Sequence, residues 1–170
     1  MKLISEIKLD MKANRGNPKG KIISSMYRIA NYYTTNKRNN LFLRIIGYPY
    51  IKLYRSLFYW WWGIEIPDRV KIGTGLQIWH GFGIVINSDV QAGDNLLLRH
   101  CTTIGNKFDG SRCPIIGNNV DIGAHTIIIG DIIIGDNVTI GAGSVVTKSI
   151  PPDHIAYGNP IKIIPKRLDI

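Results

Sequence analysis

An aliphatic residue returns at every sixth position over most of this chain of 170 residues. The two runs are Ile66, Ile72, Ile78, Ile84, Val90, Leu96 and, later, Ile116, Ile122, Ile128, Ile134, Ile140, Val146. A period of six matches neither the 3.6 residues of a helical turn nor an antiparallel sandwich, in which turn signals recur every 8 to 12 residues or so. The repeat therefore predicts a β-solenoid, in which each unit supplies one short strand and one corner.

Glycine often follows the repeated aliphatic residue, as at Gly117, Gly123 and Gly141, and a residue without a Cβ atom lets the chain turn tightly. Three units form one triangular coil, which predicts about five coils. We expect three regions: a basic, aromatic-rich helical segment at 1–62, the β-helix at 63–150 with an excursion at 105–115, and a C-terminal tail at 151–170.

The formal net charge of +9 comes from the N-terminal segment. Residues 1–62 hold 12 Lys and Arg against two acids, whereas residues 63–170 hold nine against ten. We expect helices near 21–33 and 41–60, separated by a break at Asn36–Asn40. Gly47 and Pro49 are expected to interrupt the second helix.

A basic segment that ends in the string L-F-Y-W-W-W is suited to a membrane surface, to nucleic acid or to an acidic neighbour. No nucleic-acid motif is present, so no nucleic-acid partner is expected. Arg44, Lys52 and Arg55 interrupt the apolar run too often for a transmembrane helix, although the run is suited to a bilayer surface. Packing of the aromatic residues on the first coil is the alternative.

The N-terminus has no apolar run of signal-peptide length, and Cys101 and Cys113 lack the spacing of a zinc or redox motif. These features predict a cytoplasmic protein with two free thiols. A peripheral location at the inner membrane face is compatible with this reading.

Three strings carry a resemblance to a known family: E-I-P-D-R-V-K-I-G-T-G-L-Q-I-W-H-G (65–81), I-G-A-G-S-V-V-T-K-S-I-P-P (140–152) and G-N-P-I-K (158–162). The chain resembles the hexapeptide-repeat acyltransferases, and among them the serine acetyltransferase type. The resemblance implies a mainly β fold, namely a left-handed parallel β-helix with a short helical N-terminal segment. It also implies a homotrimer, acetyl-CoA as the acetyl donor, and no metal.

Acetylation of a hydroxyl requires a base that takes the proton of the attacking oxygen, and imidazole is the usual base near neutral pH. A carboxylate that accepts a hydrogen bond from the other ring nitrogen would fix the tautomer of that imidazole. In serine acetyltransferases the acid precedes the catalytic histidine by fifteen residues. The resemblance places the base at His80, and Glu65 stands at the position of the acid.

The family holds the pantetheine arm of acetyl-CoA against small residues of the β-helix, in the groove between neighbouring subunits. The resemblance carries this role to six residues, of which Lys162 would lie near the nucleotide. They are Gly105, Ala124, Ala142, Gly143, Ser144 and Lys162.

The acceptor site departs from that of serine acetyltransferases. Trp79 replaces the aspartate that precedes the catalytic histidine, and Cys113 replaces a second histidine, whereas Arg112 is retained. Without the aspartate the ammonium group of serine loses its partner, while an indole face is suited to a sugar ring. We therefore expect a small-molecule or lipid-linked sugar of a cell-surface polysaccharide precursor as acceptor. Serine, in cysteine biosynthesis, is the alternative.

Three other classes of protein fit the sequence less well. A zinc hydratase on the same solenoid needs three converging histidines, and the period places His80, His100 and His125 at different positions of the unit. A covalent route through Cys101 or Cys113 has no adjacent base in the sequence. A non-catalytic scaffold would leave His80 without a role.

Overall fold

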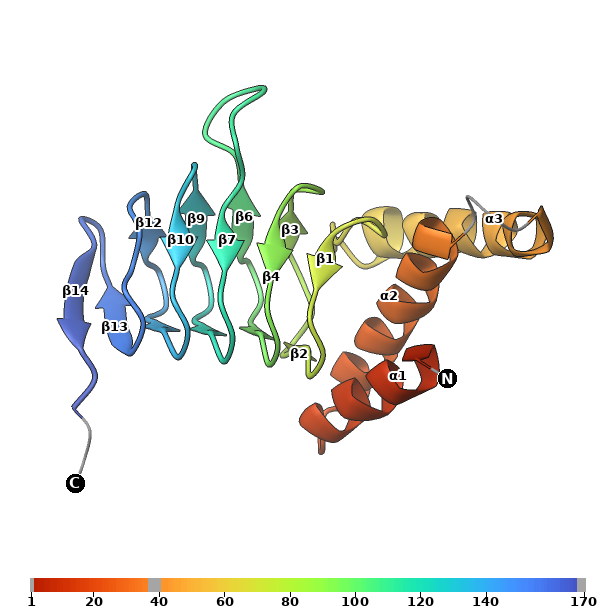
Figure 1. The fold of residues 1–170 in the computed structure, drawn as a ribbon, viewed down its shortest axis with the longest axis horizontal. Coiled ribbons are helices and arrows are strands. Elements are labelled where there is room, and N and C mark those ends of the chain that lie inside the picture. Colours follow the sequence, from red (N-terminus) through yellow and green to blue (C-terminus); the bar gives the residue numbers. More distant parts are fainter. Residues whose placement is uncertain (1, 37–40, 168–170) are drawn as a thin grey trace.

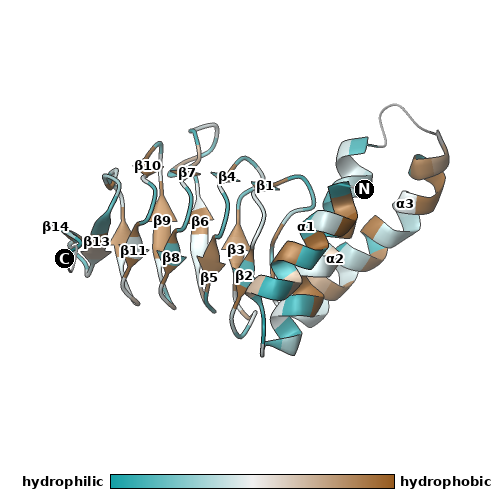
Figure 2. Cartoon of the chain, turned by 60° about the horizontal axis from the view of Figure 1, so that its bottom comes forward, coloured by the Kyte–Doolittle hydropathy of each residue, from teal (hydrophilic) through white to brown (hydrophobic). Residues whose placement is uncertain are grey.

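The structure, a computed structural model, describes residues 2–36 and 41–167. A helical segment lies at one end of its long axis and a β-helix of about four turns occupies the rest (Figures 1 and 2). The helices are α1 (Lys2–Ala13), α2 (Pro18–Asn36), α3 (Leu41–Arg55) and the π-helical turn η2 (Ser56–Trp61). This confirms the predicted fold class, with about one turn fewer than expected.

Three sheets form the sides of the β-helix, and every strand pair is parallel except β13–β14. The first sheet contains β1 (Lys71–Ile72), β4 (Gln91–Ala92), β7 (Ile115–Ile116) and β10 (Ile133–Ile134). The second contains β2 (Gln77–Ile78), β5 (Leu97–Leu98), β8 (Asp121–Ile122), β11 (Thr139–Ile140), β13 (His154–Tyr157) and β14 (Lys162–Pro165). The third contains β3 (Val85–Ile86), β6 (Thr103–Gly105), β9 (Ile127–Ile129) and β12 (Val145–Val146).

The predicted register is wrong between Ile84 and Leu96. The structure pairs Ile86 with Ile104 and Leu98 with Ile122, so the inward strand position lies two residues later than the period placed it. Two extra residues in the corner between β2 and β3 cause the shift. Because side chains alternate along a strand, a shift of two keeps the same face inward, and Ile84 is still fully buried.

One corner of the β-helix carries a ladder of side-chain amides. Asn95 donates to Asn119, Asn119 to Asn137, and Asn137 to Asp153, each over 2.9 Å. All four residues have positive φ angles between 55° and 60°, a region that Asn and Asp tolerate better than most residues. The ladder therefore combines a tight corner with hydrogen bonds between successive coils.

Helix α1 was not predicted. Helix α3 does continue through Gly47 and Pro49, contrary to expectation. A Cβ atom at Gly47 would lie 2.7 Å from the ring of Tyr33, so the glycine allows α3 to pack closely on α2. The stabilisation from this packing offsets the cost of the backbone hydrogen bond that Pro49 cannot donate. Of the expected break, Asn36 ends α2, and residues 37–40 lie outside the described residues.

The helical segment covers the open edge of the first coil with a buried ion pair. Asp10 is fully buried, accepts 2.8 Å and 3.0 Å hydrogen bonds from the backbone of Gly75 and Leu76, and pairs with Arg28 over 2.7 Å. Arg28 in turn donates to the backbone oxygen of Ile72 over 2.6 Å. Burial alone would lower the pKa of Arg28, but Asp10 raises it above its ordinary value. Each charge is thus paired and hydrogen-bonded, as a buried charge requires.

Two asparagines of the α1–α2 turn extend this cover along β2. Asn14 donates to the backbone oxygen of Leu76 over 2.7 Å and accepts from the amide of Ile78 over 3.1 Å. Asn17 donates to the oxygen of Ile78 over 2.7 Å. These side chains replace a neighbouring strand and satisfy an edge that would otherwise be free to pair with another chain.

Helix α3 and η2 bury part of their aromatic residues and expose the rest. Tyr54 and Phe58 are fully buried, and the hydroxyl of Tyr54 donates to the backbone of Ile66 over 2.7 Å. Trp60 and Trp61 are 85% and 79% exposed. The alternative of complete packing on the first coil is therefore wrong for these two tryptophans. No described helix is long and apolar enough to cross a bilayer.

Candidate functional site

At the corner between the second and third sheets, residues of successive coils lie one above another. We call this the histidine corner. Its residues are His80, Phe82, Gly83, His100, Cys101, Ala124, His125, Ala142 and Gly143. Backbone amides join the coils here: Cys101 donates to Phe82 over 2.8 Å, His125 to His100 over 3.0 Å, and Gly143 to Ala124 over 2.8 Å. These hydrogen bonds align the corner residues in a column along the β-helix.

Three imidazole rings meet at this corner. The rings of His80 and His100 lie 5.4 Å apart between centroids, those of His100 and His125 lie 5.0 Å apart, and both pairs are edge to face. The sequence-based expectation that these histidines lie at different positions is wrong for His80 and His100, because it used the slipped register, whereas His125 does follow its inward residue, Ile122, by three positions. Counted from the true inward residues, Ile78 and Leu98, His80 and His100 both come two residues later.

His100 is the residue that sequence reasoning missed. Its Nδ1 atom is buried and, within residues 2–36 and 41–167, is the one buried side-chain nitrogen or oxygen without a hydrogen-bond partner. Such atoms are rare in folded proteins, so this nitrogen marks a place where a bound molecule could supply the missing partner. Among these same residues, no group of three or more His, Cys, Asp or Glu side chains could hold a metal ion.

His80 lies in a strained and closely supported turn. Its φ angle is +67°, and that of Gly81 is +43°. A Cβ atom on Gly81 would lie 2.3 Å from Cδ1 of Ile23, a buried residue of α2, so the helical segment packs directly against this turn. The imidazole of His80 is exposed, and the neighbouring Trp79 is 37% exposed. An exposed imidazole thus directly follows a partly exposed tryptophan along the chain.

Glu65 lies one coil before this turn. Its backbone pairs with the third sheet, since its amide donates to Ile84 over 2.7 Å and its oxygen accepts from Ile86 over 2.8 Å. The carboxylate is exposed, and within the described residues it forms no hydrogen bond with His80 or with any other side chain. The structure therefore places Glu65 beside β3 on the third sheet without showing the predicted dyad.

The predicted contacts for the acetyl donor divide into two groups. Ala124, Ala142 and Gly143 lie on the histidine corner, one and two coils beyond His100. Ser144 is next to them but fully buried, and its hydroxyl donates to Gly141 and accepts from the amide of Gly158 over 3.1 Å. Its hydroxyl is therefore engaged within the fold.

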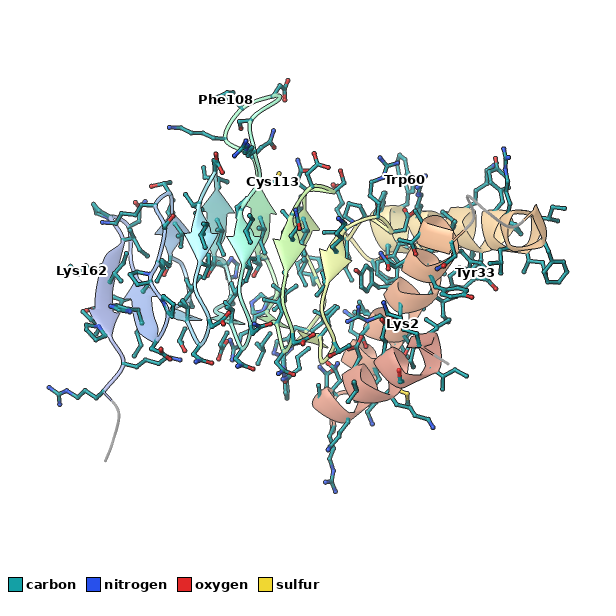
Figure 3. All side chains as sticks on the ribbon, in the orientation of Figure 1. Lys2, Tyr33, Trp60, Phe108, Cys113 and Lys162 are labelled. Carbon is teal, nitrogen blue, oxygen red and sulfur yellow. The ribbon has the colours of Figure 1, made fainter. Side chains whose placement is uncertain are left out.

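Gly105 and Lys162 lie elsewhere. Gly105 ends β6, one strand beyond the histidine corner. Lys162 begins β14, at the end of the molecule opposite the helices (Figure 3).

Arg112 and Cys113 are on the long loop between β6 and β7, which leaves the corner between the third and first sheets (Figures 1 and 3). Arg112 is exposed, and its Nη1 atom lies 3.9 Å from Oδ2 of Asp131. Cys113 is buried at the base of the loop, and burial raises the pKa of its thiol. Within one chain, then, Trp79 and His80 stand at one corner and Arg112 at another.

Comparisons with known proteins identify relatives of this chain. The family model described as "Bacterial transferase hexapeptide (six repeats)" matches residues 113–148. A protein of Escherichia coli (strain K12), provisionally named colanic acid biosynthesis acetyltransferase WcaB, is 39% identical over 155 residues, which are 91% of this chain and 96% of that protein. Serine acetyltransferase of Helicobacter pylori (strain ATCC 700392 / 26695) is 43% identical over 106 residues, 61% of this chain and 62% of that enzyme.

Solved structures with a similar fold include serine acetyltransferases. The soybean apoenzyme superposes with a TM-score of 0.79 and 30% identity, covering 95% of this chain and 69% of that one. Serine acetyltransferase from Brucella abortus strain S19 in complex with coenzyme A has a TM-score of 0.77 and 26% identity, covering 94% of this chain and 66% of that one. The similarity therefore extends over the helical segment as well as the β-helix.

Proposed function

Because the chain belongs to the hexapeptide-repeat acetyltransferases, we propose that it transfers the acetyl group of acetyl-CoA to a sugar hydroxyl, with His80 as the general base. His80 takes the proton of the acceptor oxygen as that oxygen attacks the thioester carbonyl, and coenzyme A leaves as the thiol. The observation that carries the proposal is the histidine corner. The exposed imidazole of His80 stands at one end of a column whose later members are Ala124, Ala142 and Gly143.

This column fits the donor, because small residues let a long, thin pantetheine arm approach the backbone closely. The arm would run along the corner toward His80 and bring the thioester to the base. The similarity to a structure described in complex with coenzyme A supports this choice of donor. Gly105, Ser144 and Lys162 are weaker candidates, because Ser144 is buried and the other two lie outside the corner.

Glu65 is proposed as the acid that orients His80. Its backbone is hydrogen-bonded to Ile84 and Ile86, which come just after the turn that carries His80, and its carboxylate is exposed. A carboxylate beside the imidazole would hold the neutral tautomer and stabilise the imidazolium formed during transfer.

A sugar of a surface-polysaccharide precursor is proposed as the acceptor for two reasons. The relative that matches nearly the whole chain carries a name from colanic acid biosynthesis. In addition, Trp79 offers an exposed indole beside His80 where the ammonium of serine would need an anion. Serine remains the second candidate, since the sequence and structural relatives include serine acetyltransferases. A lipid-linked precursor would place the reaction at the cytoplasmic face of the inner membrane.

The site is proposed to be completed in a homotrimer. Trp79 and His80 of one subunit and Arg112 of its neighbour would then face the same cleft, which a single chain does not assemble. Cys113, buried at the base of the same loop, would position Arg112 rather than contact the acceptor.

Mixing two impaired variants, assayed at an acceptor concentration below the raised KM, tests the base and the shared site together. His80→Ala is expected to lower kcat by roughly 10²- to 10⁴-fold, and Arg112→Ala to raise KM for the acceptor. Random mixed trimers should recover activity at about a quarter of the sites, because those sites combine an intact His80 with an intact Arg112 from the neighbour.

Acetyl transfer would be followed as thiol release with amino sugars, nucleotide sugars and serine as acceptors. A His80→Ala enzyme with wild-type turnover would exclude this base. Absence of recovery on mixing would place both residues in one subunit, and efficient use of serine would replace the sugar by the alternative acceptor.

A further inference from the structure

Helix α3 is apolar on its exposed side as well as on its buried side. Phe42, Ile45, Ile46 and Leu53 are 68%, 65%, 43% and 54% exposed. Ile45, Ile46 and Leu53 follow Phe42 by three, four and eleven residues, which places the four side chains on one face of the helix. The residues on the opposite face pack against α2 and the first coil. A helix at the surface of a soluble protein normally carries polar residues there, so this face is suited to an apolar environment.

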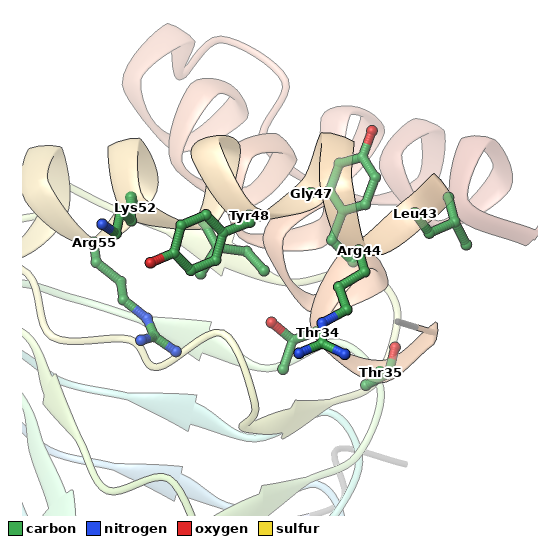
Figure 4. Close-up of a pocket in the computed structure, with 10 residues that line it drawn as sticks. Thr34, Thr35, Leu43, Arg44, Gly47, Tyr48, Lys52 and Arg55 are labelled. Atoms are coloured by element: carbon green, nitrogen blue, oxygen red, sulfur yellow. The ribbon is translucent and has the colours of Figure 1, made fainter. Parts of the chain in front are cut away.

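A basic cavity lies beside this face, between α3 and the C-terminal part of α2 (Figure 4). Its volume is about 670 Å³. Its polar lining consists of three cations and four hydroxyl side chains, without an acid: Arg44, Lys52, Arg55, Tyr33, Thr34, Thr35 and Tyr48. Figure 4 shows Arg44 and Arg55, from opposite ends of α3, turned toward the same side of the helix. The lining is suited to an anion with several acceptor oxygens.

The charges of this cavity are only partly compensated. Arg55 pairs with Asp68 over 2.8 Å. Lys52 lies 4.8 Å from the centroid of the Tyr48 ring, and within the described residues neither Lys52 nor Arg44 has an acidic partner. No acid occurs between Leu41 and Ile64. Two cations therefore stand beside the exposed apolar face without an anion to balance them.

We propose that α3 lies on an anionic membrane leaflet, with a lipid phosphate group in the α2–α3 cavity and the apolar face of α3 against the acyl chains. Arginine and lysine bind phosphate oxygens by charge-assisted hydrogen bonds, and arginine can do so with two parallel bonds. Exposed Trp60 and Trp61, which follow on η2, are the residue type that favours the headgroup region.

Charge favours a bilayer over a second copy of the chain as the occupant of this face. A second copy would bring another N-terminal segment with 12 cations against two acids, so two such faces repel each other. An anionic leaflet attracts basic residues close to its surface, and the attraction extends over about one Debye length.

The test is co-sedimentation of the full chain with vesicles of phosphatidylcholine alone or mixed with phosphatidylglycerol, without acetyl-CoA or acceptor. We expect binding to the anionic vesicles that weakens with added salt. The double variant Arg44→Gln/Lys52→Gln should lose roughly tenfold or more in affinity. Ile45→Ser/Leu53→Ser should also weaken binding, including at high salt, because it removes apolar contacts rather than charge.

The matched control is Lys8→Gln/Lys19→Gln, which removes the same charge from exposed sites on α1 and α2 and should change the affinity less than twofold or so. Circular dichroism verifies that each variant is folded. Inorganic phosphate and glycerol phosphate are added as competitors, and displacement by either at low millimolar concentration would assign the cavity to a soluble anion and overturn the lipid assignment.

Two further outcomes would overturn the inference. One is equal binding to neutral and anionic vesicles, or none to either. The other is self-association through Ile45 and Leu53 in the absence of vesicles, which would assign the face to a second copy. Because no acetyl transfer is measured, these results leave the proposed reaction untouched.

Discussion

The β-helix and the helical segment are stabilised in different ways. In the β-helix each coil repeats the contacts of the previous one, with aliphatic side chains inside and the ladder of Asn119 and its neighbours outside. In the helical segment, single side chains such as Asp10 and Arg28 each satisfy particular backbone groups of the first coil. In the β-helix, the loss of stability on removing one contact should therefore be limited by the similar contacts of neighbouring coils. In the helical segment the same loss should remain uncompensated.

The largest effect on stability is expected for Arg28→Ala. It leaves the carboxylate of Asp10 buried without its partner and removes the donor to Ile72. Removal of one member of a buried ion pair costs about 3–5 kcal/mol. Chemical denaturation measures this value against Lys19→Ala, an exposed change on the same helix that should stay within about 0.5 kcal/mol. Equal effects of the two substitutions would refute the proposed importance of the buried pair.

A smaller effect is expected for Gly81→Ala, at the contact between the two regions. The new Cβ atom would meet Ile23 at 2.3 Å, and φ of +43° is unfavourable for alanine, so we expect a loss of roughly 1–3 kcal/mol. Because the same turn carries His80, kcat should fall as well.

The variant Gly81→Ala/Ile23→Val removes Cδ1 of Ile23 and should restore part of kcat while the backbone strain remains. If kcat is unchanged in Gly81→Ala, the helical segment does not position His80.

The smallest effect is expected in the amide ladder. Asn119→Gly loses two side-chain hydrogen bonds, worth about 1 kcal/mol in total at this exposed site. Asn119→Ala loses the same hydrogen bonds, and its alanine must also adopt φ near +55°, which adds about 1 kcal/mol to the destabilisation. Thermal unfolding of the two variants separates these contributions. A loss in Asn119→Ala as large as that in Arg28→Ala would contradict the distinction between the two regions.

The helical segment was only partly predictable. The break at Asn36–Asn40 separated two expected helices that correspond to α2 and α3, but α1, whose one buried residue is Asp10, was not expected. The polar contacts of Asp10, Asn14 and Asn17 join residues more than sixty positions apart. No local sequence pattern indicates which backbone group such a side chain will reach.

The candidate site was predictable to a different degree. The roles of His80 and Glu65 stay predictions, which the resemblance of one short string, residues 65–81, could suggest because the two residues lie within one coil of each other. His100 was missed, because two extra residues between β2 and β3 shift the register and only strand pairing reveals the shift. The resemblance also indicated Arg112. Only the three-dimensional structure shows that its loop leaves the β-helix at a different corner from that of His80.

By itself, the sequence determined the β-helix, its three-sided repeat and the family of acetyltransferases. A six-residue period of buried aliphatic residues can be satisfied by few other folds, since each unit must turn the same face inward. Tertiary structure decided the stacking of His80, His100 and His125, the buried ion pair on the first coil, and the basic cavity beside the exposed face of α3. These features depend on distances between side chains of different coils and helices, which the order of residues along the chain does not fix.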